Sequence, residues 1–325
     1  MHVLIFGGTG FVGLNIAQGL LERGHAVTLF DRAGLPSAAQ RALAAFGARL
    51  RVLQGDVIDT GAVASAIDES CDALVLGAAI TADAARDAAE PDRILSVNLL
   101  AQVPMLQGAR RAGVKRVINL SSGSAYGANG QRFALLEETT PCDPVSLYSI
   151  TKFASERVAA RLADLWQTEM ISVRLSGVFG PFERGGGVRD TPSPQALIAA
   201  CCERGEPALL SEAAEKDWIY APDVAEAVST LLEAPKLQHG LYNISNDTVF
   251  TAEAWGQAFA AGRDGFVCRV ARDGETPTVP VHSPVRGRLS TARLADEFGW
   301  HAKYDCAASA AHFGRCFDDY RKDMT

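Results

Sequence analysis

Short apolar runs alternate with longer amphipathic stretches through the first half of the chain. The short runs, rich in valine, leucine, isoleucine and phenylalanine, predict β-strands, and the longer stretches predict helices. Gly24 and Gly113 stand where two of these helices should end. The predicted strands cover residues 3–6, 26–30, 51–54, 73–76 and 116–120, and the helices about 11–23, 61–67 and 94–112. Apolar strands separated by helices are typical of a parallel sheet covered on both faces.

The pattern loosens in the second half of the chain. Glycine and proline gather between residues 180 and 194, with three successive glycines at 185–187, and predict a loop region. Around it we expect helices at about 148–166, 195–204 and 224–232, and strands at 171–175 and 241–244. The whole pattern predicts an α/β fold, a doubly wound parallel sheet with a smaller, mixed C-terminal substrate domain. The expected sheet domain is 1–175 plus about 222–245, and the substrate domain is 176–221 plus 246–325.

Composition and charge narrow the expected partners. A chain of 325 residues, 48% apolar and 21% charged, is ordinary for a globular protein and long enough for one large and one smaller domain. Its net charge of −7 argues against nucleic acid and acidic membrane surfaces as main partners. The beginning of the sequence does not resemble a signal peptide, and the apolar stretches are too short to span a bilayer.

Cysteine and histidine usage favours an intracellular setting without a metal. The seven cysteines lack C-x-x-C spacing and predict reduced thiols, while the isolated histidines give no pattern for a metal site. We expect a cytoplasmic protein with a small-molecule substrate, no nucleic-acid or membrane partner, no metal and, if it assembles, a homodimer.

A glycine-rich segment follows the first predicted strand and opens the first predicted helix. Gly7, Gly10 and Gly13 have G-x-x-G-x-x-G spacing there. Glycine permits a tight turn and lets the backbone approach a pyrophosphate, whose charge the N–H groups at the helix start can bind. Alone, the glycines could form a plain turn, but the strand–turn–helix context favours a dinucleotide-binding Rossmann domain.

Acidic residues after the next two strands bear on the choice of dinucleotide. Asp31 ends the second strand, where a carboxylate accepts hydrogen bonds from the adenosine ribose and repels a 2′-phosphate. Arg32 leaves a second interpretation open, because a guanidinium can hold that phosphate or stack on adenine. Asp56 is either an adenine contact or a loop or helix-cap carboxylate. We predict NAD rather than NADP as the cofactor.

A tyrosine and a lysine four residues apart, Tyr148 and Lys152, share one face of a predicted helix. A free phenol has a pKa of about 10, and a nearby ammonium and a cationic nicotinamide both favour the phenolate, which suits Tyr148 as a general base. Ser122, at the end of the fifth strand, can hydrogen-bond the same substrate oxygen. The alternative is a surface Tyr–Lys pair on an amphipathic helix, and the position after a serine-rich strand end favours the catalytic interpretation.

These segments occur in the order of a known family. The chain resembles the extended short-chain dehydrogenase/reductases, specifically the NAD-dependent epimerase/dehydratase family, in segments 7–13, 55–57, 77–79, 96–98, 121–127, 174–181 and 216–225. The resemblance implies a catalytic trio of Ser122, Tyr148 and Lys152. It implies cofactor contacts at Gly7, Gly10, Phe11, Val12, Asp31, Arg32, Asp56, Val57, Ala78, Ala79, Asn98, Tyr148 and Lys152. It implies substrate contacts at Thr81, Ser122, Ser124, Gly177 and Arg286.

Departures from the family pattern bear on the substrate. Gly177 replaces an asparagine that often contacts the diphosphate of a nucleotide sugar, and Lys216 replaces an arginine. Arg286 is similar to a late arginine that binds substrate phosphate, so it is the expected anion contact. Gly123-Ser124 occupies the place of the Asp-Glu pair of related dehydratases, which disfavours dehydratase chemistry. The 185–187 loop either closes over substrate or is a plain surface loop.

The expected function is hydride transfer at a carbinol carbon of a sugar or nucleotide sugar, by an NAD-dependent epimerase or dehydrogenase with Tyr148 as base. The alternative is an NAD-dependent dehydrogenase of a free sugar, sugar acid or other small hydroxy compound. A non-catalytic NAD-binding sensor is disfavoured because both Tyr148 and Lys152 are present. The sequence does not identify the substrate, and it does not decide whether the net reaction is epimerisation or oxidation.

Overall fold

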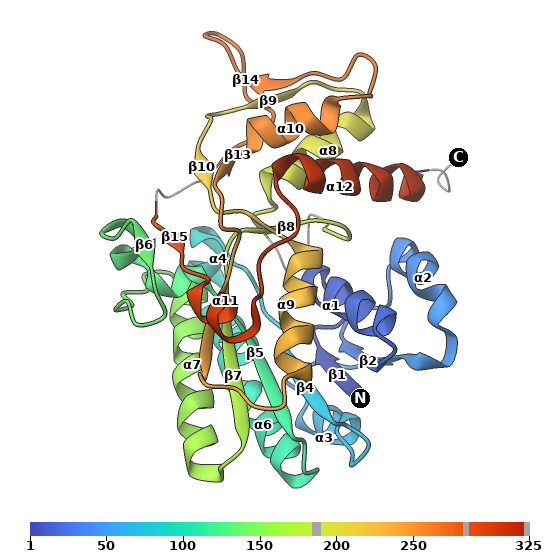
Figure 1. The fold of residues 1–325 in the computed structure, drawn as a ribbon, viewed down its shortest axis with the longest axis vertical. Helices are drawn as coiled ribbons and strands as arrows, with labels where there is room; N and C mark the ends of the chain where they lie inside the picture. The colour runs from blue at the N-terminus through green and yellow to red at the C-terminus, as the bar shows by residue number, and fades with distance from the viewer. Residues whose placement is uncertain (184–189, 282–285, 322–325) are drawn as a thin grey trace.

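A computed structural model describes residues 1–183, 190–281 and 286–321. They form a parallel seven-stranded sheet between helices, with a smaller group of helices and short strands above it (Figure 1). The strand order is β12-β7-β5-β4-β1-β2-β3, and each neighbouring pair runs parallel. The strands are β1 (His2–Phe6), β2 (Ala26–Asp31), β3 (Leu50–Gln54), β4 (Ala73–Leu76), β5 (Arg116–Ser122), β7 (Glu169–Leu175) and β12 (Leu241–Ile244). The prediction of a doubly wound α/β fold is confirmed.

Helices cover both faces of the sheet, which is why residues 3–6 of β1 and all of β4 are apolar and buried. Apolar side chains of α1, α9 and α11 pack on one face, and those of α3, α6 and α7 pack on the other. The helices of these layers and their connections are α1 (Phe11–Glu22), α2 (Ser37–Leu43), α3 (Thr60–Ala66), α4 (Ala84–Ala89), α5 (Pro91–Leu95), α6 (Gln102–Arg111), α7 (Leu147–Trp166), α9 (Ala221–Glu233) and α11 (Ala292–Phe298). Among the described helices, none combines the length and apolarity that crossing a membrane requires.

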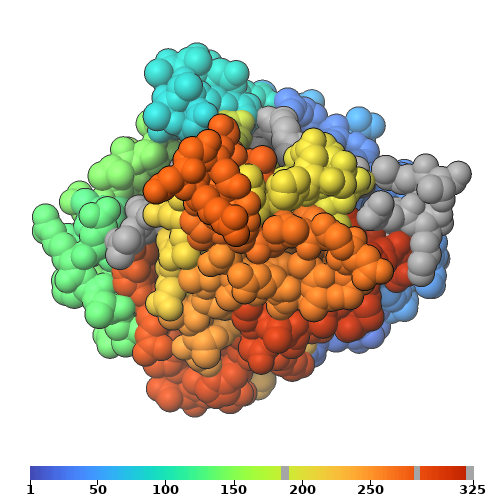
Figure 2. Space-filling model, turned by 90° about the horizontal axis from the view of Figure 1, so that it is seen from above, coloured from blue at the N-terminus to red at the C-terminus, as the bar shows by residue number. Residues whose placement is uncertain are grey.

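The smaller region has its own aromatic core, in which Trp255 lies stacked on Phe259 with the ring centres 5.3 Å apart. Its segments, coloured yellow to red, spread over the face of the molecule seen from above in Figure 2. Its helices are α8 (Pro194–Arg204), α10 (Ala252–Ala260) and α12 (Cys306–Arg321). The short strand pairs are β6 (Leu135–Leu136) with β15 (Arg288–Leu289), β8 (Val178–Phe179) with β11 (Ile219–Tyr220), β9 (Ala208–Leu210) with β14 (Cys268–Val270), and β10 (Glu215–Lys216) with β13 (Phe250–Thr251). The proposed domain boundaries stay a prediction.

The helix predicted over 94–112 is helical almost throughout but is not a regular α-helix in its middle. The chain forms α5, a wider, π-helical turn over Ser96–Leu100 and then α6. In that turn the Ala101 N–H donates to the Ser96 carbonyl at 2.9 Å, while the Gln102 side chain donates to the Asn98 carbonyl at 3.3 Å. The hydrogen bond from Ala101 to the residue five positions before it is what defines the wider turn.

Candidate active site

Two hollows that share the glycine loop lie beyond the carboxyl ends of the strands. The β2-side hollow is lined by residues that include Gly7, Gly10, Asp31, Arg32, Asp56, Val57, Ala78 and Ala79. The β5-side hollow, of about 440 Å³, is lined by residues that include Gly7, Gly10, Phe11, Val12, Ala79, Thr81, Ser122, Ser124, Tyr148, Lys152 and Gly177. Segments far apart in the sequence therefore meet at the edge of the sheet where α/β folds bind ligands.

The glycine loop is packed so closely that side chains are excluded. Gly7 has a φ of 75°, and a Cβ added there would lie 2.6 Å from the backbone nitrogen of Ala78. A Cβ at Gly13 would lie 2.4 Å from the Gly7 carbonyl oxygen. These contacts bring the start of α1 against the turn after β4. The N-terminal end of α1 thereby stands at both hollows and offers its partial positive charge to an anion.

Asp31 is held at the tip of β2 beside the glycine loop. Its carboxylate accepts hydrogen bonds from the backbone N–H groups of Thr9, at 3.2 Å, and Ala33, at 3.1 Å. Arg32 is exposed and lines the same hollow. The structure thus places both residues at the β2-side hollow, where either ribose or phosphate recognition was expected.

Asp56 has a partner that sequence reasoning missed. Burial opposes its ionisation, but the Arg93 guanidinium, 2.8 Å away, and the Ile58 N–H outweigh burial and lower the pKa of the Asp56 carboxyl. Arg93 comes from α5 and also lines the β2-side hollow. An ion pair between distant segments leaves no local spacing signal, so no pattern in the sequence pointed to Arg93.

Tyr148 and Lys152 lie at the start of α7, which is capped by Ser146. The Ser146 hydroxyl accepts from the Ser149 N–H at 3.2 Å. Tyr148 is in the first turn of α7, where the partial positive charge of the helix favours an anion. The Lys152 ammonium lies 5.8 Å from the centre of the Tyr148 ring and donates to the Leu120 carbonyl at 2.7 Å. Lys152 is 3% exposed, and burial lowers its pKa to about 8.

Two serines at the end of β5 complete the polar side of the β5-side hollow. The Ser122 Oγ accepts from the Ser124 N–H at 3.1 Å, and an oxygen that accepts one hydrogen bond can still donate its own hydrogen into the hollow. The Ser124 Oγ is buried and has no hydrogen-bond partner among the described residues. Both serines line the same hollow as Tyr148 and Lys152.

Two predicted contacts, Asn98 and Arg286, are not among the residues lining either hollow in the described parts of the chain. Asn98 is fully buried and accepts from the Ile80 N–H at 2.8 Å. Arg286 donates to the buried Asp217 carboxylate at 2.8 Å and to the Ser176 hydroxyl at 2.7 Å. Their direct ligand contacts stay predictions, as does closure of the 185–187 loop, which lies outside the described residues.

Gly177 faces a tryptophan that fills the place of a side chain. A Cβ at Gly177 would lie 2.7 Å from the Trp218 ring and 3.0 Å from the Lys216 Cε. The Lys216 ammonium in turn lies 4.5 Å from the centre of the Trp218 ring. All three residues line the β5-side hollow. Glycine at this position is therefore required by the indole ring, a contact that the sequence alone did not reveal.

Comparison with known proteins identifies the family. The family model described as "NAD dependent epimerase/dehydratase family" matches residues 3–245. The chain belongs to this family. Family membership confirms the predicted resemblance, including NAD as the cofactor, and places the glycine loop and the Tyr148 segment within the matched range.

Proteins similar to this chain are named for different reactions. A dTDP-glucose 4,6-dehydratase of Mycolicibacterium smegmatis is 30% identical over 71% of this chain and 69% of its own length. A 3 beta-hydroxysteroid dehydrogenase/Delta 5-->4-isomerase of Mycobacterium tuberculosis is 35% identical over 55% of this chain, and the match spans about half, 47%, of that protein. The solved UDP-glucose 4-epimerase of Thermus thermophilus, in complex with NAD, has a TM-score of 0.78 and 26% identity, covering 98% of this chain and 99% of its own.

Proposed function

We propose that this protein is an NAD-dependent epimerase or dehydrogenase that acts at a carbinol carbon of a nucleotide sugar, with Tyr148 as the base. One observation carries the proposal: Tyr148, Lys152 and Ser122 line the same hollow as the glycine loop. The Thermus epimerase, whose fold matches along the whole chain, supports the substrate class.

The two hollows suit the two halves of a dinucleotide. The residues of the β2-side hollow, with Asp31 at the strand tip, would hold the adenosine half, and the start of α1 would face the pyrophosphate. The nicotinamide half would lie toward Tyr148 and Lys152. Bound NAD supplies the hydride acceptor for the reaction.

The side chains of the β5-side hollow supply the proton chemistry. The Tyr148 phenolate removes the proton of the substrate hydroxyl while the hydrogen on the same carbon leaves as hydride, so the C–O bond becomes a carbonyl. The Lys152 ammonium and the start of α7 stabilise the phenolate, and the Ser122 hydroxyl hydrogen-bonds the reacting oxygen. In an epimerase, the carbonyl carbon would accept a hydride from the reduced cofactor on its other face, and Tyr148 would return the proton to the oxygen.

The residues next to Ser122 support a reaction without dehydration. Gly123 packs so that a Cβ would lie 3.2 Å from the Leu289 side chain and 3.4 Å from the Leu175 carbonyl oxygen. Ser124, the next residue, has no ionisable group. No carboxylate therefore stands at the two positions that follow Ser122, although a dehydratase is among the relatives.

A second candidate is dehydrogenation of a hydroxy compound that lacks a nucleoside diphosphate. It is favoured by the packing of Trp218 against Gly177, which removes the expected amide, and by the pairing of Arg286 with Asp217. The relation to a 3 beta-hydroxysteroid dehydrogenase fits this candidate as well.

A screen of substrates distinguishes the candidates. NADH absorbance is followed with nucleotide sugars, free sugars, sugar acids and 3 beta-hydroxysteroids, and chromatography of the products detects epimers formed without net NADH. The proposal expects turnover of a nucleotide sugar. NADH formation from the other classes alone would favour the second candidate, and turnover of a nucleotide sugar to a dehydrated product would contradict the reaction type.

Removing the Ser122 hydroxyl should slow the reaction. Ser122→Ala is expected to lower kcat by about 10²-fold, because the reacting oxygen loses a positioned hydrogen bond. Ser65→Ala, on the exposed surface of α3, is the matched control and should leave kcat unchanged. Steady-state kinetics with the substrate from the screen measures both, and a normal kcat in Ser122→Ala would remove Ser122 from the proposed mechanism.

Asp31 should set the preference for NAD. Asp31→Ala is expected to reduce the preference for NADH over NADPH about tenfold, because the carboxylate no longer binds ribose or repels a 2′-phosphate. Fluorescence titration with both reduced cofactors measures the ratio of the two affinities. Asp92→Ala, at an exposed position, is the control. Equal or tighter binding of NADPH by the unaltered protein would instead assign Arg32 to a phosphate.

A further inference from the structure

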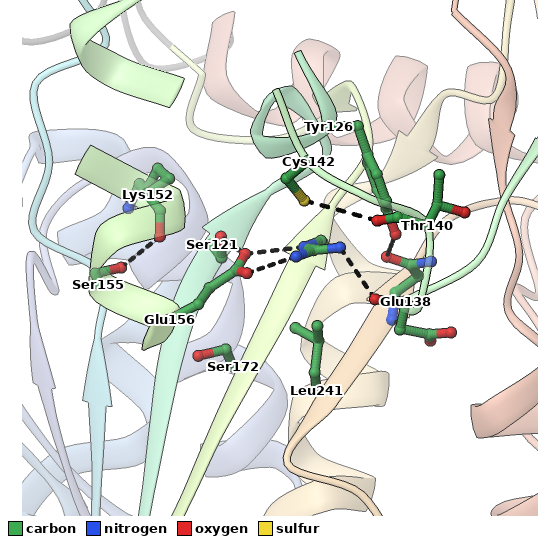
Figure 3. Close-up of polar contacts among 12 residues, drawn as sticks. Ser121, Tyr126, Glu138, Thr140, Cys142, Lys152, Ser155, Glu156, Ser172 and Leu241 are labelled. Carbon is green, nitrogen blue, oxygen red and sulfur yellow. Dashed lines mark hydrogen bonds and ion pairs between the residues drawn. The ribbon is translucent and has the colours of Figure 1, made fainter. Parts of the chain in front are cut away.

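A buried ion pair lies directly behind the Tyr148–Lys152 pair. Glu156, one helical turn after Lys152 on α7, accepts from the Arg174 guanidinium of β7 at 3.0 and 2.7 Å. The two side chains are 5% and 3% exposed. The Ser121 hydroxyl also donates to Glu156, and Figure 3 shows Glu156 pointing from α7 toward this serine. Ser121 and Arg174 are register partners in the sheet, so Glu156 joins α7 to two neighbouring strands.

The far side of the ion pair is fixed by an aromatic ring. The Arg174 guanidinium lies 4.5 Å from the centre of the Tyr126 ring, and the Tyr126 hydroxyl donates to Asn243 at 3.0 Å. Burial opposes the charge of Arg174, but its hydrogen bonds and attraction to Glu156 raise the pKa of the guanidinium above its ordinary range. Arg174 therefore stays charged and keeps Glu156 in one orientation.

On the side nearer to Tyr148, the ion pair adjoins the end of β5. Side chains of α7 form hydrogen bonds with two successive residues there. Tyr148, Lys152 and Glu156 are spaced by four and so share one helical face. Lys152 donates to the Leu120 carbonyl, and Glu156 accepts from Ser121. The next residue along the strand is the catalytic candidate Ser122. The same contacts that join α7 to β5 thus set the position of Ser122 relative to the Tyr148 phenol.

Lys152 depends on few groups for its charge. Burial lowers its pKa to about 8, and Glu156 is the side chain that counters this effect. In the described parts of the chain, the groups that act on Lys152 include the Tyr148 ring, the Leu120 carbonyl on β5 and the charge of Glu156, which is paired with Arg174 on β7. A buried ammonium is costly unless a compensating charge is near.

We propose that Glu156 is a positioning residue of the reaction: its carboxylate, fixed by Arg174, ties the end of β5 to α7 and places a negative charge one helical turn behind the Lys152 ammonium. Glu156 itself does not touch the substrate; it acts through Lys152 and Ser121. This inference rests on the proposed function, because it gives Glu156 an effect on the base Tyr148.

Ionisation of Tyr148 tests the inference without a substrate. The ultraviolet absorbance of tyrosinate is titrated against pH in the NAD complex, and the curve of Tyr148→Phe is subtracted to isolate Tyr148. Glu156→Gln should move the ionisation of Tyr148 upward by about one pH unit, because Lys152 then loses its proton earlier and no longer stabilises the phenolate. Because less Tyr148 is then ionised at neutral pH, the kcat of Glu156→Gln should fall about tenfold, with the KM little changed.

Companion variants separate charge from folding. Glu156→Gln leaves Arg174 without its carboxylate partner. The double variant E156Q/R174M buries no lone charge, so it should fold and shift the ionisation of Tyr148 in the same direction by a smaller amount. Glu156→Asp keeps the charge and should restore most of the ionisation. The matched control is Glu169→Gln, which breaks the Arg116–Glu169 pair between the same two strands at their other end and should leave the Tyr148 titration unchanged.

The titrations separate a failure of Tyr148 as the base from a failure of the role of Glu156. If Tyr148 ionises near the ordinary value of about 10 in the unaltered protein, the proposed base fails, and the inference fails with it. If Tyr148 is shifted in the unaltered protein and ionises identically in folded E156Q/R174M, only the role of Glu156 is overturned. Far-ultraviolet circular dichroism and NADH fluorescence establish that each variant is folded.

Discussion

Tyr148→Phe should lower turnover on the order of 10³-fold and leave NAD affinity unchanged, because it deletes only the oxygen that exchanges the proton. The ring itself remains over Lys152 and in the first turn of α7, so the cofactor side of the site keeps its shape. NADH absorbance with the substrate from the screen gives kcat, and NADH fluorescence gives the affinity.

A second tyrosine provides the control for this experiment. Tyr304→Phe deletes a hydroxyl in the aromatic cluster with Tyr220 and His312, away from the residues lining the two hollows. It should turn over normally. Near-normal kcat in Tyr148→Phe would refute the proposed base, whereas loss of NADH binding in that variant would mean that the Tyr148 hydroxyl contributes to cofactor binding.

Lys152→Ala should affect both turnover and cofactor binding. Turnover is expected to fall on the order of 10³-fold, because the phenolate loses its ammonium and the Leu120 carbonyl loses its partner. NAD affinity should also fall by about tenfold, since a lysine at this position is expected to reach the nicotinamide ribose.

Turnover and NAD affinity are measured separately for Lys152→Ala. Lys115→Ala, whose side chain is 82% exposed, serves as control and should change neither value. Normal NAD affinity with reduced turnover would limit Lys152 to the support of Tyr148. Normal turnover would contradict its place in the mechanism and, with it, the explanation given for Glu156.

The sequence predicted the central sheet well because most of its strands, though not the edge strand β3, are buried on both faces. All four residues of β4 are buried, and such continuous apolar runs are distinct from their surroundings. By contrast α4 buries no residue, and pairs such as β8 and β11 contribute two residues each, so neither left a hydrophobic period to detect.

The site was predictable where spacing along one element carries the chemistry. The glycine loop and the Tyr148–Lys152 pair are local patterns, and the structure brings them to one edge of the sheet. The ion pairs of Asp56 with Arg93 and of Glu156 with Arg174 join separate elements and depend on the fold itself. For Arg286, the sequence indicated a ligand contact because of its positive charge. In the structure that charge forms an ion pair with Asp217 of the protein itself.

The contact between Gly177 and Trp218 restricts how this site can change. A larger residue at position 177 would collide with the indole ring, so its effect depends on which residue occupies position 218. Substitutions at two touching positions are not additive. If the specificity of the site changed one substitution at a time, Trp218 would therefore have to become smaller before position 177 could accept an amide side chain. The reverse order would press that side chain against the indole ring.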